Sequence, residues 1–403
     1  MLIYKFISNL FFYLGYPFIL FRLKGRERKE RLGHLINKFE KSIWIHAASV
    51  GEVNAIKTLI NELLNKYPNK DFVLSTTTAT GQDIARKISP KLTAFFFPID
   101  IDFVMKRVFN CINPELIILV ETEFWPNMLD IAKKRNIPII LINGRLSDES
   151  FPNYRRFRFF WKPIWKSIIA VNAQSDKDTK RFIGFKFKNV KNTHNLKFCI
   201  DLPLYENNKL RKELGYSEND FILVWGSSRP GEEKLLKNVF SSLEKEINNF
   251  KVIIVPRHLH RLPEIREIFK DYGFRLYSEL KIPGKVLIVD EMGVLNMFYA
   301  LADVAVVGGS FYNFGGHNPL EPAFYSTPTI IGKYHSSCHD SVDRLHDNNG
   351  IIISDRNKLS EDILRIAKDE KLAKQLGKNA KRTLQLNSDS LKKNLEILEK
   401  YIK

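Results

Sequence analysis

The chain of 403 residues is too long for one compact core, so two domains are expected. Its composition, with 44% hydrophobic and 27% charged residues, excludes a mainly disordered chain. The formal net charge of +18 indicates an anionic partner, which could be nucleic acid, an anionic membrane surface or a phosphorylated substrate.

The first predicted element is an apolar N-terminal segment. Residues 6–21 are nearly all apolar or aromatic, and six Lys or Arg residues follow between positions 22 and 31. The apolar run is at the short end for a helix that crosses a bilayer, and no signal-peptide cleavage site follows it. We expect residues 1–35 to be a membrane anchor with a basic flank, held at a cytoplasmic face. A helix packed on the first domain is the alternative.

Beyond residue 35, short strand patterns alternate with helical patterns in two successive series. The first series begins at SIWIHA (42–47), and the second begins at FILVWGS (221–227). This alternation predicts an α/β fold with two doubly wound parallel sheets. We divide the chain into Rossmann-like domains at 36–200 and 216–385, a linker at 201–215 and a C-terminal helix at 386–403. Because ligands of such sheets bind beyond the carboxyl ends of the strands, the residues after each strand are the candidates.

Acidic residues follow two strands of the first series. Glu52 comes after the first strand, in the first turn of a helix, where it either complements the helix dipole or acts as a carboxylate that takes a proton. Glu121 and Glu123 follow another buried strand and project to the same side of an extended chain. Arg145, after the next strand, is a candidate cation for them. The sequence does not decide whether these residues form a structural ion pair or a ligand site.

Cations and hydroxyls follow two strands of the second series. Ser227 and Arg229 stand between one strand and its helix, and Arg257 and His258 follow the next strand. Such groups beside helix N-termini are typical of phosphate binding.

Cysteine and histidine residues form no recognisable framework. The three cysteines are scattered and make no CxxC pair, which favours a reducing compartment. The histidines at 258 and 260 and the cluster at 335–339 lack the further ligands that a zinc site needs. We therefore predict no metal site.

A glycine-rich loop, GGSFYNFGG, separates a strand from the string HNPLEPA. With Asn318 as the N-cap, Glu321 would take the third helical position of a capping box, although Pro322 fits this register poorly. In the alternative that we favour, the loop and the helix N-terminus face a phosphate. Glu321 then accepts hydrogen bonds from paired hydroxyls, such as those of a ribose.

Taken together, these strings resemble the 3-deoxy-D-manno-octulosonic acid (Kdo) transferases of lipopolysaccharide assembly, glycosyltransferases of the GT-B fold. The resemblance rests on IWIHAASVGEV (43–53), ETEFWPN (121–127), GSSRPGEE (226–233), PRH (256–258) and GGSFYNFGGHNPLEPA (308–323). It implies two Rossmann-like domains facing a central cleft, and transfer of Kdo from CMP-Kdo to the lipid A disaccharide precursor (lipid IVA) with inversion. It also implies no metal, no separate cofactor and a location at the inner membrane, with the catalytic domains on the cytoplasmic side.

Carried over position by position, the resemblance implies that Glu52 is the general base and Glu321 the ribose ligand. The implied donor side comprises Ser227, Arg229, Arg257, His258, Met292, Gly293, Gly308, Gly309, Ser310, Gly315, Gly316, His317, Asn318 and Glu321. The implied acceptor side comprises Ser49, Gly51, Glu121, Glu123, Arg145, Ser147 and Lys197.

The chain departs from the family pattern at His194, Gly144, Cys199 and Lys333. These departures leave the acceptor and the number of transferred sugars open. A nucleotide-sugar epimerase is one alternative, which the apolar N-terminus argues against. A basic nucleic-acid-binding protein is another, disfavoured because the specific strings all lie at strand ends, so we expect no nucleic acid partner. The oligomeric state stays open.

Overall fold

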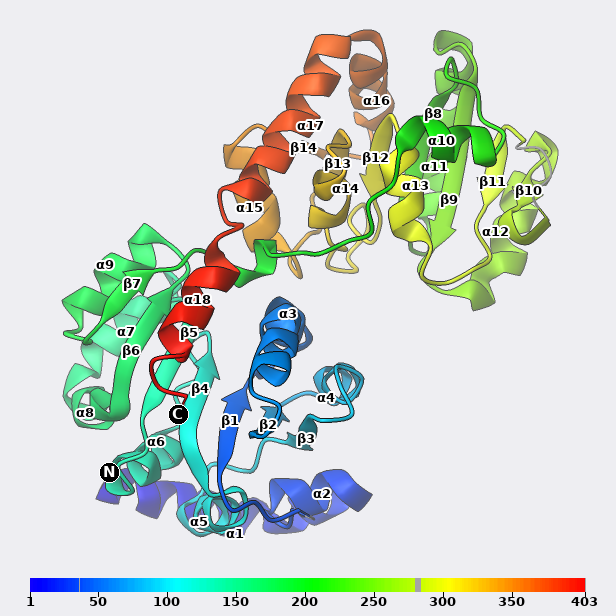
Figure 1. Cartoon of the computed structure of the whole chain (residues 1–403). Coiled ribbons are helices and arrows are strands. Elements are labelled where there is room, and N and C mark those ends of the chain that lie inside the picture. Colours follow the sequence, from blue (N-terminus) through cyan, green and yellow to red (C-terminus); the bar gives the residue numbers. More distant parts are fainter. Residues whose placement is uncertain (36, 280–283, 403) are drawn as a thin grey trace. The chain divides into compact units, whose positions relative to one another are not determined.

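The computed structural model describes residues 1–35, 37–279 and 284–402 (Figure 1). Backbone contacts divide the chain into two compact units, Met1–Cys199 with Asn387–Lys403, and Ile200–Leu386. Each unit is built on a parallel seven-stranded sheet, so the predicted α/β fold with two doubly wound sheets is confirmed. Ile36, with which the predicted 36–200 domain begins, lies outside the described residues, as does Lys403.

The sheet of the first unit has the strand order β3-β2-β1-β4-β5-β6-β7. The order reverses beside β1, so the neighbours β1 and β4 form the topological switch point of this sheet, where open α/β sheets bind ligands. Its strands are β1 (Ser42–His46), β2 (Asp71–Thr76), β3 (Thr93–Phe96), β4 (Pro114–Val120), β5 (Ile139–Gly144), β6 (Ile168–Ala173) and β7 (Val190–Asn192).

Helices cover both faces of this sheet, because alternate strand residues point to opposite faces. Trp44 packs into one buried cluster with α5, α6 and α9, whereas Ile43 and Ile45 pack into another with α3. The helices of this unit that follow β1 are α3 (Val50–Lys66), α4 (Ala79–Ala85), α5 (Asp102–Ile112), α6 (Pro126–Lys134), α7 (Ser150–Arg156), α8 (Arg158–Ile164), α9 (Asp176–Gly184) and α18 (Ser390–Leu398), with short 3-10 turns η1 (Trp165–Ser167) and η2 (Leu196–Phe198).

The apolar N-terminus forms α1 (Leu2–Arg22), followed by α2 (Gly25–Arg31). Phe12 is buried against Ile101 and Val104, so α1 packs beside α5 (Figure 1). Several large side chains of α1 are nevertheless exposed: Phe6, Phe11, Tyr13, Leu14, Phe18 and Phe21. No helix in the described part of the chain is long and apolar enough to cross a membrane. Membrane attachment therefore stays a prediction.

The last residues of the chain return to the first unit. Leu398 is buried in the cluster beneath α3, and the Asn172 side-chain amide donates to Oδ1 of Asn394 at 2.7 Å. The sequence predicted a helix at 386–403 without indicating where it packs.

The sheet of the second unit has the order β10-β11-β9-β8-β12-β13-β14, which reverses beside β8, so β8 and β12 form its switch point. Its strands are β8 (Phe221–Ser228), β9 (Phe250–Pro256), β10 (Arg275–Leu276), β11 (Val286–Ile288), β12 (Val304–Val307), β13 (Thr329–Gly332) and β14 (Ile352–Ser354). Its helices are α10 (Asn207–Glu213), α11 (Glu232–Glu246), α12 (Leu262–Phe269), α13 (Leu295–Leu301), α14 (Leu320–Phe324), α15 (His339–Asp347), α16 (Leu359–Lys368) and α17 (Glu370–Gln385), with 3-10 turns η3 (Leu259–Arg261), η4 (Lys270–Tyr272) and η5 (Tyr277–Glu279).

The segment predicted as a linker, 201–215, has no strand but contains α10. Leu210 and Arg211 of this helix are buried in the second unit, and Arg211 forms an ion pair with Asp303 at 2.8 Å. Much of the segment is therefore part of that unit's packing.

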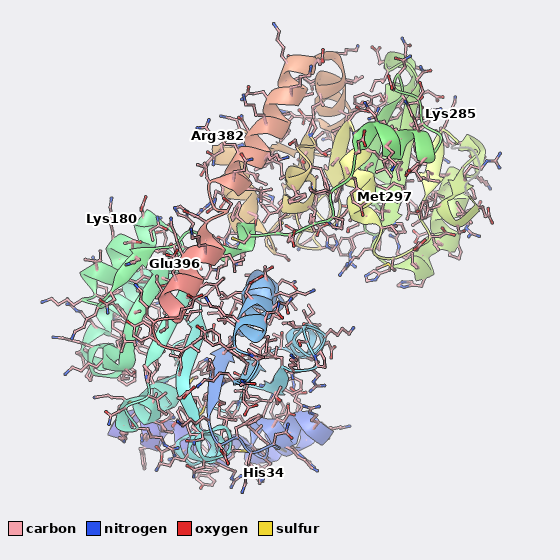
Figure 2. All side chains as sticks on the ribbon, in the orientation of Figure 1. His34, Lys180, Lys285, Met297, Arg382 and Glu396 are labelled. Carbon is pink, nitrogen blue, oxygen red and sulfur yellow. The ribbon has the colours of Figure 1, made fainter. Side chains whose placement is uncertain are left out.

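The excess positive charge lies almost entirely in the first unit, where 37 Lys and Arg residues outnumber 20 Asp and Glu residues, whereas the second unit has 26 and 25. Figure 2 shows the side chains of Lys180 in the first unit, and of Lys285 and Arg382 in the second, pointing away from the ribbon. All three residues are exposed. In the second unit the exposed cations are balanced by a nearly equal number of acidic residues.

Candidate active site

Glu52 lies at the switch point of the first sheet, where the chain passes from β1 into α3. Ser49 is the N-cap of α3, and its hydroxyl donates to Oε1 of Glu52 at 2.8 Å while accepting from the Glu52 backbone N–H. The backbone N–H of Ala48 donates to Oε2 of Glu52 at 2.8 Å. These bonds fix the carboxylate in one position at the strand end.

The environment of Glu52 raises the pKa of its carboxylate. Burial, and secondarily the negative charge of Glu121, raise the pKa of Glu52 to about 7, although the bonds from Ser49 and Ala48 act in the opposite direction. Only 7% of the residue is exposed. A general base is most effective when its pKa is close to the operating pH. The capping role and the role of a base are therefore compatible in this residue.

Glu121 and Glu123 follow β4, the strand next to β1 in the sheet. Glu121 has a φ of 57°, which turns the chain sharply at the strand end. Its Oε1 lies 2.9 Å from Nζ of Lys197, so a predicted acceptor-side cation holds it in place. The indole N–H of Trp125 donates to Oε2 of Glu123 at 3.1 Å. The predicted pairing of these acids with Arg145 stays a prediction.

Two other predicted acceptor-side residues have distinct local roles. The Ser147 hydroxyl accepts from the Ser150 backbone N–H at 3.1 Å, at the beginning of α7. Gly51 is exposed in the first turn of α3, where an added Cβ would meet only Oγ of Ser49, at 3.8 Å. Because glycine weakens a helix by up to about 1 kcal/mol relative to alanine, local folding alone does not account for this glycine.

In the second unit, cationic side chains gather at the ends of β8 and β9. The Arg229 guanidinium hydrogen-bonds the ring of His258 and lies 4.7 Å above the ring centroid of Phe314. Burial, followed by the charges of Arg257 and Arg229, lowers the pKa of His317 to about 4. The same kind of repulsion, after burial, lowers the pKa of His258. This part of the unit is therefore strongly electropositive and suited to a phosphate.

The glycine loop after β12 approaches β8 closely. A Cβ on Gly308 would lie 2.4 Å from the carbonyl oxygen of Ser227, and one on Gly315, whose φ is 87°, would lie 2.2 Å from Oγ of Ser337. These two positions require glycine. Gly309, Ser310 and Gly316 complete the loop, with the ring of His317 beside Gly309.

Glu321 follows this loop, in the first turn of α14. The helix begins at Leu320, one residue later than the capping-box interpretation required, and the Asn318 side chain accepts from the Leu320 backbone N–H at 3.1 Å. The carboxylate of Glu321 accepts from the Asn318 side-chain amide at 3.4 Å, whereas a capping box would use the Asn318 backbone N–H. Burial raises the pKa of Glu321, and the hydrogen bond from Asn318, followed by the charge of Arg257, partly opposes this shift.

Met292 and Gly293 lie in the turn that leads from β11 to α13. Met292 is exposed, and Gly293 has a φ of 90° with open space around its Cβ position. No group of three or more metal-binding side chains occurs in residues 1–35, 37–279 and 284–402.

Sequence reasoning missed one residue of this region, Glu232. Its carboxylate is fully buried and accepts hydrogen bonds from the backbone N–H groups of Gly309 and Ser310. The sequence predicts that this loop faces a phosphate, whereas these two amides donate to a carboxylate of the protein. The signal in the sequence was the Glu-Glu pair that ends GSSRPGEE, which reads as an ordinary acidic first turn of a helix.

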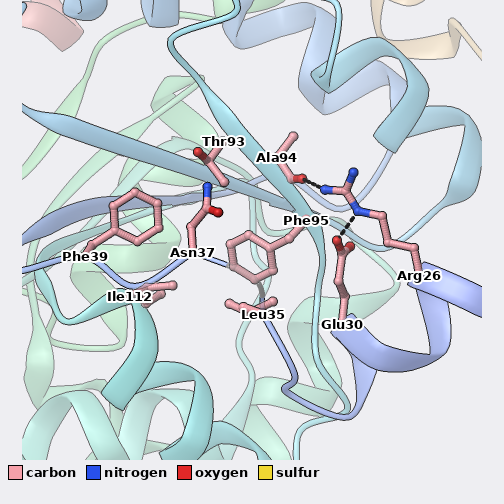
Figure 3. A pocket seen from close by; sticks show the side chains of 9 residues that line it. All are labelled: Arg26, Glu30, Leu35, Asn37, Phe39, Thr93, Ala94, Phe95 and Ile112. Carbon is pink, nitrogen blue, oxygen red and sulfur yellow. Dashed lines mark hydrogen bonds and ion pairs between the residues drawn. The ribbon is translucent and has the colours of Figure 1, made fainter.

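A cavity of about 240 Å³ lies elsewhere in the first unit, at the amino ends of the strands (Figure 3). Phe39, Phe95 and Ile112 provide apolar walls, and Arg26 pairs with Glu30 at one side. None of the predicted site residues lines this cavity, and Ile36, between two of its lining residues, lies outside the described residues.

Two doubly wound sheets with candidate residues at both switch points define a GT-B type glycosyltransferase fold. The chain is similar to a solved glycosyltransferase from Rickettsia africae over 91% of this chain and 100% of that one, with a TM-score of 0.54 and 15% identity. It is also similar to the UDP-GlcNAc 2-epimerase of Neisseria meningitidis, over 89% of this chain and 100% of that one, with a TM-score of 0.57 and 11% identity. At these identities the likeness shows the fold alone.

Sequence comparisons show the family. A profile of the 3-deoxy-D-manno-octulosonic-acid transferases matches residues 26–200, and a profile of glycosyl transferases group 1 matches residues 206–383. The 3-deoxy-D-manno-octulosonic acid transferase of Rickettsia bellii is 30% identical, over 82% of each chain, and that of Haemophilus influenzae is 28% identical over 90% of this chain and 87% of the relative. The chain belongs to the Kdo transferase family, as its motifs predicted.

A further relative is longer than this chain. The bifunctional glycosyltransferase/methyltransferase of Fusobacterium nucleatum is 39% identical over 74% of this chain, which spans 48% of that relative's length.

Proposed function

We propose that the chain is an inverting glycosyltransferase that moves Kdo from CMP-Kdo to the lipid A disaccharide precursor. The main support for this proposal is that Glu52, at a switch point of the first sheet, is a buried carboxylate with its pKa raised to about 7. The chain that holds it belongs to the Kdo transferase family. Such a carboxylate is partly ionised at neutral pH and can take a proton from a sugar hydroxyl.

In the proposed step, Glu52 takes the proton of the acceptor hydroxyl while the hydroxyl oxygen attacks the anomeric carbon of Kdo. The bond from that carbon to the phosphate oxygen breaks, and its electron pair leaves with CMP. A single displacement inverts the configuration and needs one base, whereas a covalent intermediate would need a second carboxylate as nucleophile. Glu121 contributes by raising the pKa of Glu52, and Lys197 holds Glu121.

On the donor side, the leaving CMP gains negative charge on its phosphate. Arg229 and Arg257 would neutralise that charge, which is the role of fixed cations at a transferring phosphate. With its pKa lowered to about 4, His317 is neutral at pH 7 and would contribute a hydrogen bond rather than a charge. Glu321 would accept the ribose hydroxyls, as the family resemblance implies.

The proposed acceptor carries phosphates and acyl chains, and both features match the chain. The net charge of +18 favours an anionic lipid, and α1 exposes large apolar side chains beside the basic α2 segment. We therefore place the enzyme, as part of this proposal, at the cytoplasmic side of the inner membrane.

Replacing the proposed base tests the proposal. We expect Glu52→Gln to lower the rate of Kdo transfer by about 10²–10⁴-fold, because the amide cannot take a proton. CMP affinity should stay within about twofold of the wild-type value, since Glu52 is assigned to the acceptor side. Glu62→Gln is the matched control, because Glu62 is an exposed glutamate of the same helix. Near-normal transfer by the Glu52 variant would remove Glu52 as the base.

A further inference from the structure

The GSSRPGEE motif contains two neighbouring buried glutamates with different surroundings. Glu233 pairs with the Arg261 guanidinium at 2.6 Å and accepts from the hydroxyl of Ser228 at 2.7 Å. Glu232 has 0% exposure and, within the described part of the chain, forms no ion pair. Burying a carboxylate without a cation costs free energy unless hydrogen bonds stabilise the charge, so the folded protein depends on the hydrogen bonds to Glu232.

Four backbone N–H groups donate to the carboxylate of Glu232. The N–H groups of Arg229 and Gly309 each lie 2.9 Å from Oε2, and those of Ser310 and Phe311 lie 3.0 and 3.1 Å from Oε1. Such a ring of amides is an anion-binding nest, and here the anion belongs to the protein. Burial raises the pKa of Glu232 above its usual value, and these four bonds limit the rise.

The four donors come from two segments that are distant in sequence. Arg229 follows β8, whereas Gly309, Ser310 and Phe311 follow β12 about eighty residues later, and the two strands are neighbours in the sheet. Glu232 therefore joins the two loops of the switch point. It also fixes the backbone of Arg229, whose guanidinium lies beside His258.

Three further amides of the loop are also engaged within the protein. The N–H of Gly308 donates to the Gly226 carbonyl, and those of Gly316 and His317 donate to the carbonyls of Gly309 and Gly308. Most of the backbone donors that a phosphate could have used are thus occupied. The charge of a bound phosphate then falls mainly to cationic side chains, so the position of Arg229 matters.

We propose that Glu232 is a positioning residue of the donor site, which holds the Arg229 backbone and the 309–311 turn in a single arrangement that binds CMP. The proposal rests on CMP-Kdo as the donor. It differs from a purely structural role, in which the loss of Glu232 would lower stability and leave the affinity of the folded protein for CMP unchanged.

The sign of the change in affinity separates positioning from simple electrostatics. Removing a negative charge near a site for an anion should tighten CMP binding if charge alone matters. If Glu232 acts by positioning, its removal leaves buried N–H groups without acceptors, the turn shifts, and binding weakens.

The test is CMP titration of the full-length protein by calorimetry, with three variants. We expect Glu232→Gln, which removes the charge and supplies one oxygen, to weaken CMP binding by about tenfold or more. Glu232→Asp keeps the charge but shortens the side chain, which moves the carboxylate away from the four N–H groups, so this variant should weaken CMP binding similarly. Glu233→Gln removes the adjacent buried charge and leaves the four bonds in place, so we expect a lower melting temperature with CMP affinity within about twofold.

Hydrogen exchange provides a readout that needs no ligand. A peptide covering residues 308–314 should exchange about tenfold faster in both Glu232 variants than in the wild type, while peptides from β8 and β9 stay unchanged. Unchanged exchange in this peptide, or unchanged or tighter CMP binding by the folded Glu232 variants, would overturn the positioning role. Failure of the wild-type protein itself to bind CMP would contradict the proposed donor, and the exchange result would still decide the role of Glu232 in holding the loop.

Discussion

At the scale of single residues, the chemistry depends on how burial and hydrogen bonds balance at each carboxylate. Glu52 and Glu232 are both buried, and in both burial raises the pKa while hydrogen bonds limit the rise. Glu52 receives two such bonds and has Glu121 nearby, whereas Glu232 receives four from backbone amides. The first environment suits a group that gains and loses a proton, and the second suits a fixed anion.

The raised pKa of Glu52 predicts the pH dependence of the reaction. A base acts only when it is ionised, so kcat/KM for the acceptor should rise with pH through about 7 and level off above it. An ordinary glutamate would already be ionised near pH 5 and would give a flat profile across this range. Initial rates measured from pH 5.5 to pH 8.5 check this, and a profile that is flat or falls as pH rises would contradict the assigned role.

At the scale of elements, α1 combines two kinds of contact. Phe12 packs against α5, and Nζ of Lys5 lies 3.0 Å from a carboxylate oxygen of Asp130, so one side of the helix is attached to the first unit. Phe11 and Phe18 are exposed. This division is expected of a helix that lies on a bilayer surface with its exposed apolar side chains in the headgroup region.

The exposed phenylalanines of α1 give a direct test of membrane attachment. We expect the double variant Phe11→Ser, Phe18→Ser to bind vesicles containing anionic lipid at least tenfold more weakly than the wild type, because each buried phenylalanine contributes about 1.5–3 kcal/mol. Phe159→Ser is the control, since Phe159 is an exposed phenylalanine of α8. Co-sedimentation with vesicles is the measurement. Equal binding by the double variant and the control would show that α1 does not make this contact.

At the scale of the whole molecule, the sequence predicted the features that depend on local patterns, and it did not predict contacts between residues that are distant in the chain. The strands and the loops after them could be predicted because each depends on residues that are neighbours in sequence. Glu52 could be predicted as a candidate for the same reason, since it follows its strand closely. The return of α18 to the first unit depends on contacts such as that of Lys66 with Glu399, across most of the chain. The bonds to Glu232 likewise join loops that only the folded sheet brings together, so no local pattern could indicate them.

Transfer of Kdo to the lipid A precursor can be measured directly in one assay. Purified full-length protein in detergent would be mixed with the lipid A precursor and freshly generated CMP-Kdo, with no divalent metal during the transfer step. Mass spectrometry of the lipid would follow. We predict a product heavier by one or more Kdo residues, which also gives the number transferred. Unchanged lipid, from folded protein that binds CMP, would contradict the proposed reaction.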